Sequence, residues 1–322
     1  MEAVEIDGSL GEGGGQIART SLSLSALTGR PLRLYNIRAG RDPPGLKPQH
    51  LACARAVRSI ARGVLEGAEE GSEELTYSPV QIYGGNYEFD IGTAGSAILL
   101  AQAILPLLFA ASKKSRVMIR GGTHVPTAPT YEYFEKIFLP ALSMFGLEAR
   151  CSLRRAGFFP RGGGEITLET SPGAPKPVSL WPRESSPHAL IICSNLPLKV
   201  PMREKKVFLS NDINEVYMRE YPASGAGNAV LLWRGFCGSA VLGEKGLRSE
   251  EVSRTAIEEL EGEGDAEVDH RLADQLLLYA ALAGKTRFKT SRLSKHTETS
   301  IYVIEKFLGK KFFREGNELW VE

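Results

Sequence analysis

One histidine in this chain stands where it could act as a nucleophile. His296 follows Ser294 and precedes residues 300–308, in which apolar side chains recur at helical spacing before Gly309. Serine and threonine ahead of such a segment are typical helix N-caps, so the sequence predicts His296 at a helix start. The positive end of a helix favours the neutral, nucleophilic imidazole, and the free amides beside it can bind phosphate. The pattern indicates a histidine that attacks phosphorus, with a capping or surface histidine as the alternative.

A glycine-rich turn supplies the next reactive side chains. Residues 11–16 read Gly-Glu-Gly-Gly-Gly-Gln, between a predicted strand at 4–6 and a predicted helix at 17–27. Such a turn lets the backbone approach a ligand and leaves its amides free to bind anions. Glu12 is suited to binding a metal or orienting a hydroxyl, and Arg19 to holding a phosphate. The spacing is neither that of a P-loop nor that of a dinucleotide fingerprint, and a tight turn with a solvated glutamate is the alternative.

A stiff basic loop follows between residues 37 and 50. It carries Arg38, Arg41 and Lys47 together with three prolines, and a helix is predicted to begin at residue 51. Basic side chains on a stiff loop contact phosphates without reading bases, although an ordinary solvated loop has the same composition. The whole chain has 39 basic and 38 acidic residues, a net charge of +1. This balance excludes a globally basic nucleic-acid-binding protein and limits any such contact to a local site.

The composition is that of an ordinary globular protein. With 322 residues, of which 43% are hydrophobic and 24% charged, the chain can build a sizeable core, and two domains are expected. The longest apolar run, residues 97–111, is too short to span a membrane and predicts a buried helix. The first residues lack the pattern of a signal peptide, which predicts a cytoplasmic protein with no membrane contact. The four cysteines and five histidines show no metal-ligand spacing, which argues against zinc sites and disulfides.

Helices that end near a glycine and lead into a strand recur along the chain, at Gly29, Gly146 and Gly284. After the last of these, residues 311–314 and 318–321 predict a hairpin joined by Glu315-Gly316-Asn317. These units predict an α/β (α+β) fold in which repeated βαβαββ modules pack around a common axis.

A proline-rich segment divides the chain. Residues 171–177 read as a linker, and strands with an acidic helix at 249–260 follow it. The sequence therefore predicts a large catalytic domain formed by residues 1–175 and 271–322. A smaller inserted α/β domain is predicted over residues 178–268.

Taken in order, these segments resemble one family, the RNA 3′-terminal phosphate cyclases, in its archaeal type. The matching stretches are 7–8, 11–17 and 19; 37–41, 44–46 and 49–51; 92–96 and 102; 121–123 and 128–129; 157–160 and 162–164; 225–228; 272–276; and 296–297. The resemblance covers essentially the whole chain. The combination is specific to the family, whereas a single glycine triplet is not.

The resemblance implies an enzyme that works by three nucleotidyl steps. His296, which matches the family nucleophile, would attack the ATP α-phosphate and release pyrophosphate. The AMP would then pass to an RNA 3′-phosphate, and the neighbouring 2′-hydroxyl would displace it to leave a 2′,3′-cyclic end. A divalent metal, Mg²⁺ or Mn²⁺, would help to screen the phosphate charges. The implied partners are ATP and an RNA with a 3′-phosphate end, and a homo-oligomer is possible.

The resemblance also implies a role for each matching residue. The catalytic residues would be His296, Glu12 and Arg19, and Glu12 would also bind the metal. The residues that hold phosphates and the RNA end would be Arg19, Arg38, Arg41 and Gln49. The residues of the ATP and AMP pocket, besides His296, would be Gln102, Pro129, Arg271, Asp274 and Gln275.

The adenine contact differs from that of the bacterial relatives. They have a stacking aromatic residue where this chain has His270-Arg271, and the guanidinium plane of Arg271 is expected to stack on the base instead. For Asp274 and Gln275 the alternative role is capping of the apolar helix predicted at 276–282.

Two other classes of protein are built from similar modules. Non-catalytic relatives that bind pre-ribosomal RNA lack the catalytic histidine, so His296, Glu12 and Arg19 favour the enzyme over this alternative. Enolpyruvyl transferases are larger two-lobed chains with other motifs, which this sequence lacks. The cyclase activity is therefore the function that the sequence favours.

Overall fold

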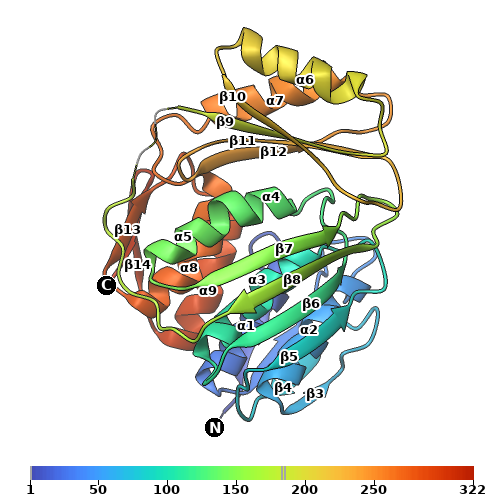
Figure 1. Ribbon diagram of the computed structural model, residues 1–322. Coiled ribbons are helices and arrows are strands. Elements are labelled where there is room, and N and C mark those ends of the chain that lie inside the picture. The colour runs from blue at the N-terminus through green and yellow to red at the C-terminus, as the bar shows by residue number, and fades with distance from the viewer. Residues whose placement is uncertain (1, 183, 185) are drawn as a thin grey trace.

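Four sheets and the helices between them make up the structure, a computed structural model that describes residues 2–182, 184 and 186–322 (Figure 1). The first sheet belongs to the N-terminal unit of the fold, which we call module 1. The elements of this module are β1 (Val4–Asp7), α1 (Gly15–Thr28), β2 (Leu32–Tyr35), α2 (Pro48–Ala61), β3 (Val64–Glu66) and β4 (Leu75–Ser78). The strand order is β1-β2-β4-β3, with β1 parallel to β2 and β4 antiparallel to both of its neighbours.

Module 2 repeats this arrangement. Its elements are β5 (Asn86–Asp90), α3 (Ala97–Ala110), β6 (Ser115–Gly121), the helical stretch α4 (Tyr131–Tyr133), η1 (Phe134–Phe138) and α5 (Leu139–Met144), then β7 (Ala149–Arg155) and β8 (Gly164–Thr170). The strand order β5-β6-β8-β7 has the same pairing as module 1, with the first two strands parallel. Both modules are therefore βαβαββ units, as predicted.

Module 3 is the same unit with its first strand reduced to a single bridge. Its elements are α8 (His270–Ala283), β13 (Thr286–Lys289), α9 (Lys295–Leu308), β14 (Phe312–Glu315) and β15 (Glu318–Val321). The order β13-β15-β14 matches the last three strands of the other modules, and Val268 forms a parallel bridge with Thr290 where the first strand would lie. The predicted repeat of βαβαββ modules is thus confirmed.

The fourth sheet is formed by the residues between modules 2 and 3. Its elements are β9 (His188–Ser194), α6 (Lys199–Ser210), β10 (Glu215–Glu220), β11 (Gly227–Arg234), β12 (Cys237–Leu242) and α7 (Ser249–Glu261). Both helices cover the outer face of the sheet (Figure 1). Ile191, Phe208, Val230 and Val252 belong to a separate small core between these helices and the sheet. The sheet lies where the smaller domain is predicted, while the bounds of that domain stay a prediction.

Several elements begin earlier than predicted. α9 starts at Lys295 rather than at residue 300, so His296 lies inside its first turn. α8 starts at His270, because Asp269 caps it, and this places Asp274 in its second turn. α2 starts at Pro48, since proline is well suited to the first helical position. The hairpin is confirmed with a shorter loop, since Glu315 pairs with Glu318.

The helices of all three modules share one hydrophobic core. α1 packs against α2, α3 and α9, and α8 packs against α9. This packing brings the glycine-rich turn before α1 next to the start of α9. None of the helices in the described part of the chain combines the length and the apolar character that a membrane crossing requires.

Asp269 fastens α8 to two other parts of the fold. Its Oδ1 accepts hydrogen bonds from the amides of Arg271 at 2.9 Å and Leu272 at 2.8 Å. The hydroxyl of Tyr133 donates to the carboxylate at 2.8 Å, and the amide of Gly238 donates at 3.0 Å. The side chain is fully buried, and this burial raises its pKa to about 6. Asp269 therefore joins the start of α8 to the helical stretch of module 2 and to β12.

Replacement of Asp269 by alanine should lower the free energy of unfolding by about 3 kcal/mol or more, because buried donors lose their acceptor and α8 loses its cap. Urea denaturation measures the change. Asp269→Asn, which retains one acceptor oxygen, should cost less. Equal stability of the alanine variant and the parent protein would contradict this role.

Candidate active site

A single cavity of about 830 Å³ brings together every residue for which the sequence predicts a role at the site. They are Glu12, Arg19, Arg38, Arg41, Gln49, Gln102, Pro129, Arg271, Asp274, Gln275 and His296. They come from modules 1, 2 and 3, so the cavity lies where the three modules meet. Their individual roles stay predictions.

The glycine-rich turn is packed directly against the first turns of α9. Gly11 has a φ of 65°, and a Cβ at this position would collide with Oγ1 of Thr299. The amide of Glu12 donates to the same hydroxyl at 3.2 Å, and Nε2 of Gln16 donates to Oγ of Ser300 at 2.7 Å. The glycine is thus required both for its conformation and for the close approach that places Glu12 beside His296.

Glu12 lies between His296 and Arg41. Its Oε2 is 3.0 Å from Nδ1 of His296, and its Oε1 is 2.6 Å from Nη2 of Arg41. The Nδ1 atom is buried and is not aligned for a hydrogen bond, so the contact with Glu12 is one of charge and proximity. A carboxylate at Nδ1 favours a proton on that nitrogen, which leaves the lone pair on Nε2.

Asp274 holds the start of α9 rather than the start of its own helix. It accepts hydrogen bonds from Oγ of Ser294 at 2.8 Å and from Oγ1 of Thr297 at 2.5 Å. Burial raises the pKa of Asp274, although both hydroxyls act to lower it. Ser294 in turn caps the turn that carries His296, with its Oγ accepting from the His296 amide at 3.0 Å. Capping of α8 by Asp274 is therefore wrong, because Asp269 fills that role.

Two residues of the basic loop region serve the architecture of the cavity. Arg38 is buried, and its Nη1 donates to the carbonyl oxygens of Pro43 at 3.0 Å and Gly45 at 2.8 Å. Oε1 of Gln49 accepts from the amide of Ser96, the N-cap of α3, at 2.7 Å. Both side chains line the cavity and also hold its wall in place.

Other predicted residues lie on α1, α3 and α8. Arg19 lies on α1 close to Glu12, and its burial lowers its pKa. Nε2 of Gln102 donates to Oε1 of Gln275 at 2.5 Å, which joins α3 to α8. Nη1 of Arg271 is 3.2 Å from Oε2 of Glu259 on α7. An ion pair at the edge of a guanidinium leaves its face free for stacking. The stacking of Arg271 on adenine stays a prediction.

His50 is a cavity residue for which the sequence predicts no role. It lies at the third position of α2, and its Nδ1 accepts from the amide of Lys47 at 3.1 Å. Burial, together with the charges of Arg19, Arg38 and Lys47, lowers the pKa of His50 to about 3. The three-residue spacing between Lys47 and His50, across Pro48, is the sequence signal of this capping arrangement.

The low pKa of His50 should make stability fall with acid. An unfolded histidine binds a proton below its ordinary pKa of about 6.5, whereas the folded one stays neutral, so stability is lost as the pH falls through this value. Between pH 7 and pH 5, His50→Gln should lose about 2 kcal/mol less stability than the parent protein. Urea denaturation at both pH values tests this, and identical losses would refute it.

Comparison with known proteins identifies the family. Residues 10–313 match the family model described as RNA 3′-terminal phosphate cyclase. The RNA 3′-terminal phosphate cyclase of Archaeoglobus fulgidus is 40% identical over 328 residues, covering 99% of this chain and 100% of that protein. Those of Methanosarcina barkeri and Ectopseudomonas mendocina are each 39% identical, covering 98% and 95% of this chain and 97% and 92% of those proteins. This chain therefore belongs to the RNA 3′-terminal phosphate cyclase family.

Proposed function

We propose that this protein converts an RNA 3′-phosphate to a 2′,3′-cyclic phosphodiester at the expense of ATP, through a covalent His296–AMP intermediate and an RNA–adenylate anhydride. The observation that carries the proposal is the pairing of His296 with Glu12 in a cavity rich in arginine. The relatives that match almost the whole chain bear the name of this activity.

The first step transfers AMP to His296. With the ring proton on Nδ1, next to the Glu12 carboxylate, the Nε2 lone pair attacks the α-phosphorus of ATP. The new N–P bond forms as the bond to pyrophosphate breaks, and the two electrons of that bond leave with the pyrophosphate. Arg19 offsets the charge on the phosphates of ATP.

The next steps pass AMP to RNA and then close the ring. An oxygen of the RNA 3′-phosphate attacks the phosphorus of the His296 adduct, and the N–P bond breaks. The proton retained on Nδ1 makes the ring a good leaving group. The 2′-hydroxyl then attacks the 3′-phosphorus, loses its proton and expels AMP. Because this attack is intramolecular, proximity supplies much of its rate.

The proposed divalent metal fits the cavity as a companion of the phosphates. In the described part of the chain, no group of three or more histidine, cysteine or carboxylate side chains could form a cage for an ion. Mg²⁺ commonly binds through one or two carboxylates together with substrate phosphates, and Glu12 can provide one such ligand. When bound, the metal would screen phosphate charge.

The proposal is tested by incubating the protein with α-labelled ATP and then denaturing it. Acid-labile, alkali-stable AMP on the protein is expected, and RNA with a 3′-phosphate should discharge it. RNA with a 3′-hydroxyl serves as the control and should leave the label in place. A protein that binds RNA and never becomes labelled would instead support the non-catalytic alternative.

Arg41 and Arg38 should respond differently to replacement by alanine. Because Arg41 is proposed to bind the RNA phosphate, its loss should slow AMP transfer to RNA by about tenfold more than self-adenylylation. The stability should change little, since the side chain is half-exposed. Arg38→Ala should lower stability as well, because the loop loses the donor to two carbonyl groups. Single-turnover kinetics and urea denaturation separate these effects.

Lysine at position 41 should restore little of the transfer rate, since it cannot form a bidentate contact. Arg55→Ala, which removes an exposed arginine of α2 outside the cavity lining, is the matched control. Equal slowing of both steps in Arg41→Ala would assign this residue to ATP.

A further inference from the structure

The cavity carries a cationic side chain, Arg292, that has no role in the mechanism above. Among the lining residues that the structure describes, six are cationic and two, Glu12 and Asp274, are acidic. The six are Arg19, Arg38, Arg41, Lys47, Arg271 and Arg292. Both acids already have partners, Glu12 in Arg41 and His296 and Asp274 in two hydroxyl groups. The cavity therefore has an excess of positive charge, which suits an anionic ligand.

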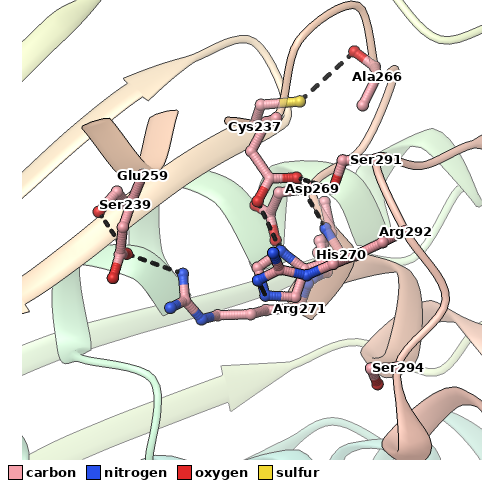
Figure 2. Close-up of polar contacts among 12 residues, drawn as sticks. Cys237, Ser239, Glu259, Ala266, Asp269, His270, Arg271, Ser291, Arg292 and Ser294 are labelled. Atoms are coloured by element: carbon pink, nitrogen blue, oxygen red, sulfur yellow. Dashed lines mark hydrogen bonds and ion pairs between the residues drawn. The ribbon is translucent and has the colours of Figure 1, made fainter. Parts of the chain in front are cut away.

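Arg292 differs from the other exposed arginines of the cavity because its partner is a neutral ring. Arg41 and Arg271 each form an ion pair with a glutamate. Nη2 of Arg292 instead lies 2.9 Å from Nε2 of His270. Both side chains are drawn in Figure 2. No carboxylate in the described part of the chain lies within ion-pair distance of Arg292, so its charge is not offset by a direct contact.

The hydrogen-bond roles in this contact are set by chemistry. A guanidinium can only donate, so Nε2 of His270 must accept the hydrogen bond and Nδ1 must carry the ring proton. That proton points to Oε1 of Glu263, which is 2.5 Å from Nδ1. The result is a chain from a buried carboxylate through a neutral imidazole to a guanidinium at the cavity.

The segment that carries Arg292 is held on both sides. Oγ of Ser291 donates to Oε2 of Glu263 at 2.5 Å, and the carbonyl oxygen of Ser291 accepts from Nδ2 of Asn317 at 2.6 Å. Ser294, two residues after Arg292, donates a hydrogen bond to Asp274. The guanidinium is thus oriented before any ligand binds, which lowers the entropic cost of binding.

We propose that Arg292 binds a phosphate group of ATP in the cavity, with His270 and Glu263 as the residues that position it. This inference rests on the proposed function, in which the cavity binds ATP. A guanidinium has five N–H donors, and the contact with His270 leaves others for a bidentate phosphate contact.

The chain places Arg292 with the nucleotide rather than with the RNA end. His270 precedes Arg271 and Gln275 on α8, and both of these belong to the predicted adenine pocket. The side chains assigned to the RNA end, Arg38 and Arg41, come from module 1 instead.

Equilibrium binding tests the proposal without requiring catalysis. Calorimetry would compare ATP, AMP and adenosine in a His296→Asn background, in which ATP is not consumed. Arg292→Ala should weaken ATP binding by about tenfold or more and change adenosine binding less than about twofold. His270→Ala should weaken ATP binding in the same direction by a smaller factor, and Arg292→Lys should retain part of the affinity. Arg287→Ala, which removes an exposed arginine of β13, is the control and should behave as the background protein.

Several outcomes would overturn the inference. One is unchanged ATP binding by Arg292→Ala, and another is an equal loss for ATP and adenosine, which would show a structural role. A loss confined to a 3′-phosphorylated oligonucleotide, relative to its 3′-hydroxyl form, would assign Arg292 to RNA and refute the ATP contact. If the background protein itself fails to bind ATP, the proposed function fails together with this inference. ATP binding that persists while Arg292→Ala has no effect rejects the inference alone.

Discussion

Replacement of His296 by alanine or asparagine should abolish labelling of the protein by α-labelled ATP, with a loss of at least about 10⁴-fold in the rate of AMP transfer. His296 is the nucleophile of the proposed mechanism, and neither substitute can form a phosphoramidate in its place. The fold should survive, because the side chain is half-exposed and the cap of α9 is formed by Ser294. Gel electrophoresis of the labelled protein measures the rate of AMP transfer, and thermal denaturation measures the stability of the fold.

A second histidine provides the control for this experiment. His188 lies in β9 and is not among the residues that line the cavity, so His188→Asn should be labelled as fast as the parent protein. Persistent labelling of His296→Ala would move the nucleophile to another residue. Thermal denaturation is measured for both substitutions of His296, and the variant that keeps the stability of the parent protein decides the result.

An RNA that ends in a 3′-phosphate on a 2′-deoxy sugar should accept AMP and then stall as the adenylate anhydride. Ring closure needs the 2′-hydroxyl as its internal nucleophile, and its removal deletes the proximity advantage, which amounts to about 10⁵ M or more in effective concentration. Accumulation of the capped strand, resolved on a denaturing gel, is the expected result. The cyclic product should be undetectable.

The matched control is the same strand with a terminal ribose, which should proceed to the cyclic end without accumulating anhydride. A 3′-hydroxyl strand should leave the adenylylated protein unreacted, because no phosphate is present to accept AMP. Rapid breakdown of the deoxy-ended anhydride at the rate of the ribose strand would show that the proposed order of steps is wrong.

The local features of this protein were determined by the sequence alone. Helical spacing after residue 300 and the serine and threonine residues before it place His296 at a helix start, and α9 begins there. Glycines after helices predict the repeat of modules, because glycine readily adopts the left-handed conformation that commonly ends a helix, as Gly29 does. The order of family motifs predicts which residues have a role at the site. These residues all line one cavity, while their roles stay predictions.

Only the tertiary structure decided what these residues contact. Glu12 meets Thr299 across 287 residues of sequence, because α1 packs against α9, and no local pattern encodes that contact. The same holds for Asp274, which local sequence assigns to a helix cap but which packing turns toward the start of α9. Hydrogen-bond partners and burial depend on how modules pack, whereas turns and helix ends depend on neighbours in the chain. For this reason the contact between Arg292 and His270 had no signal in the sequence.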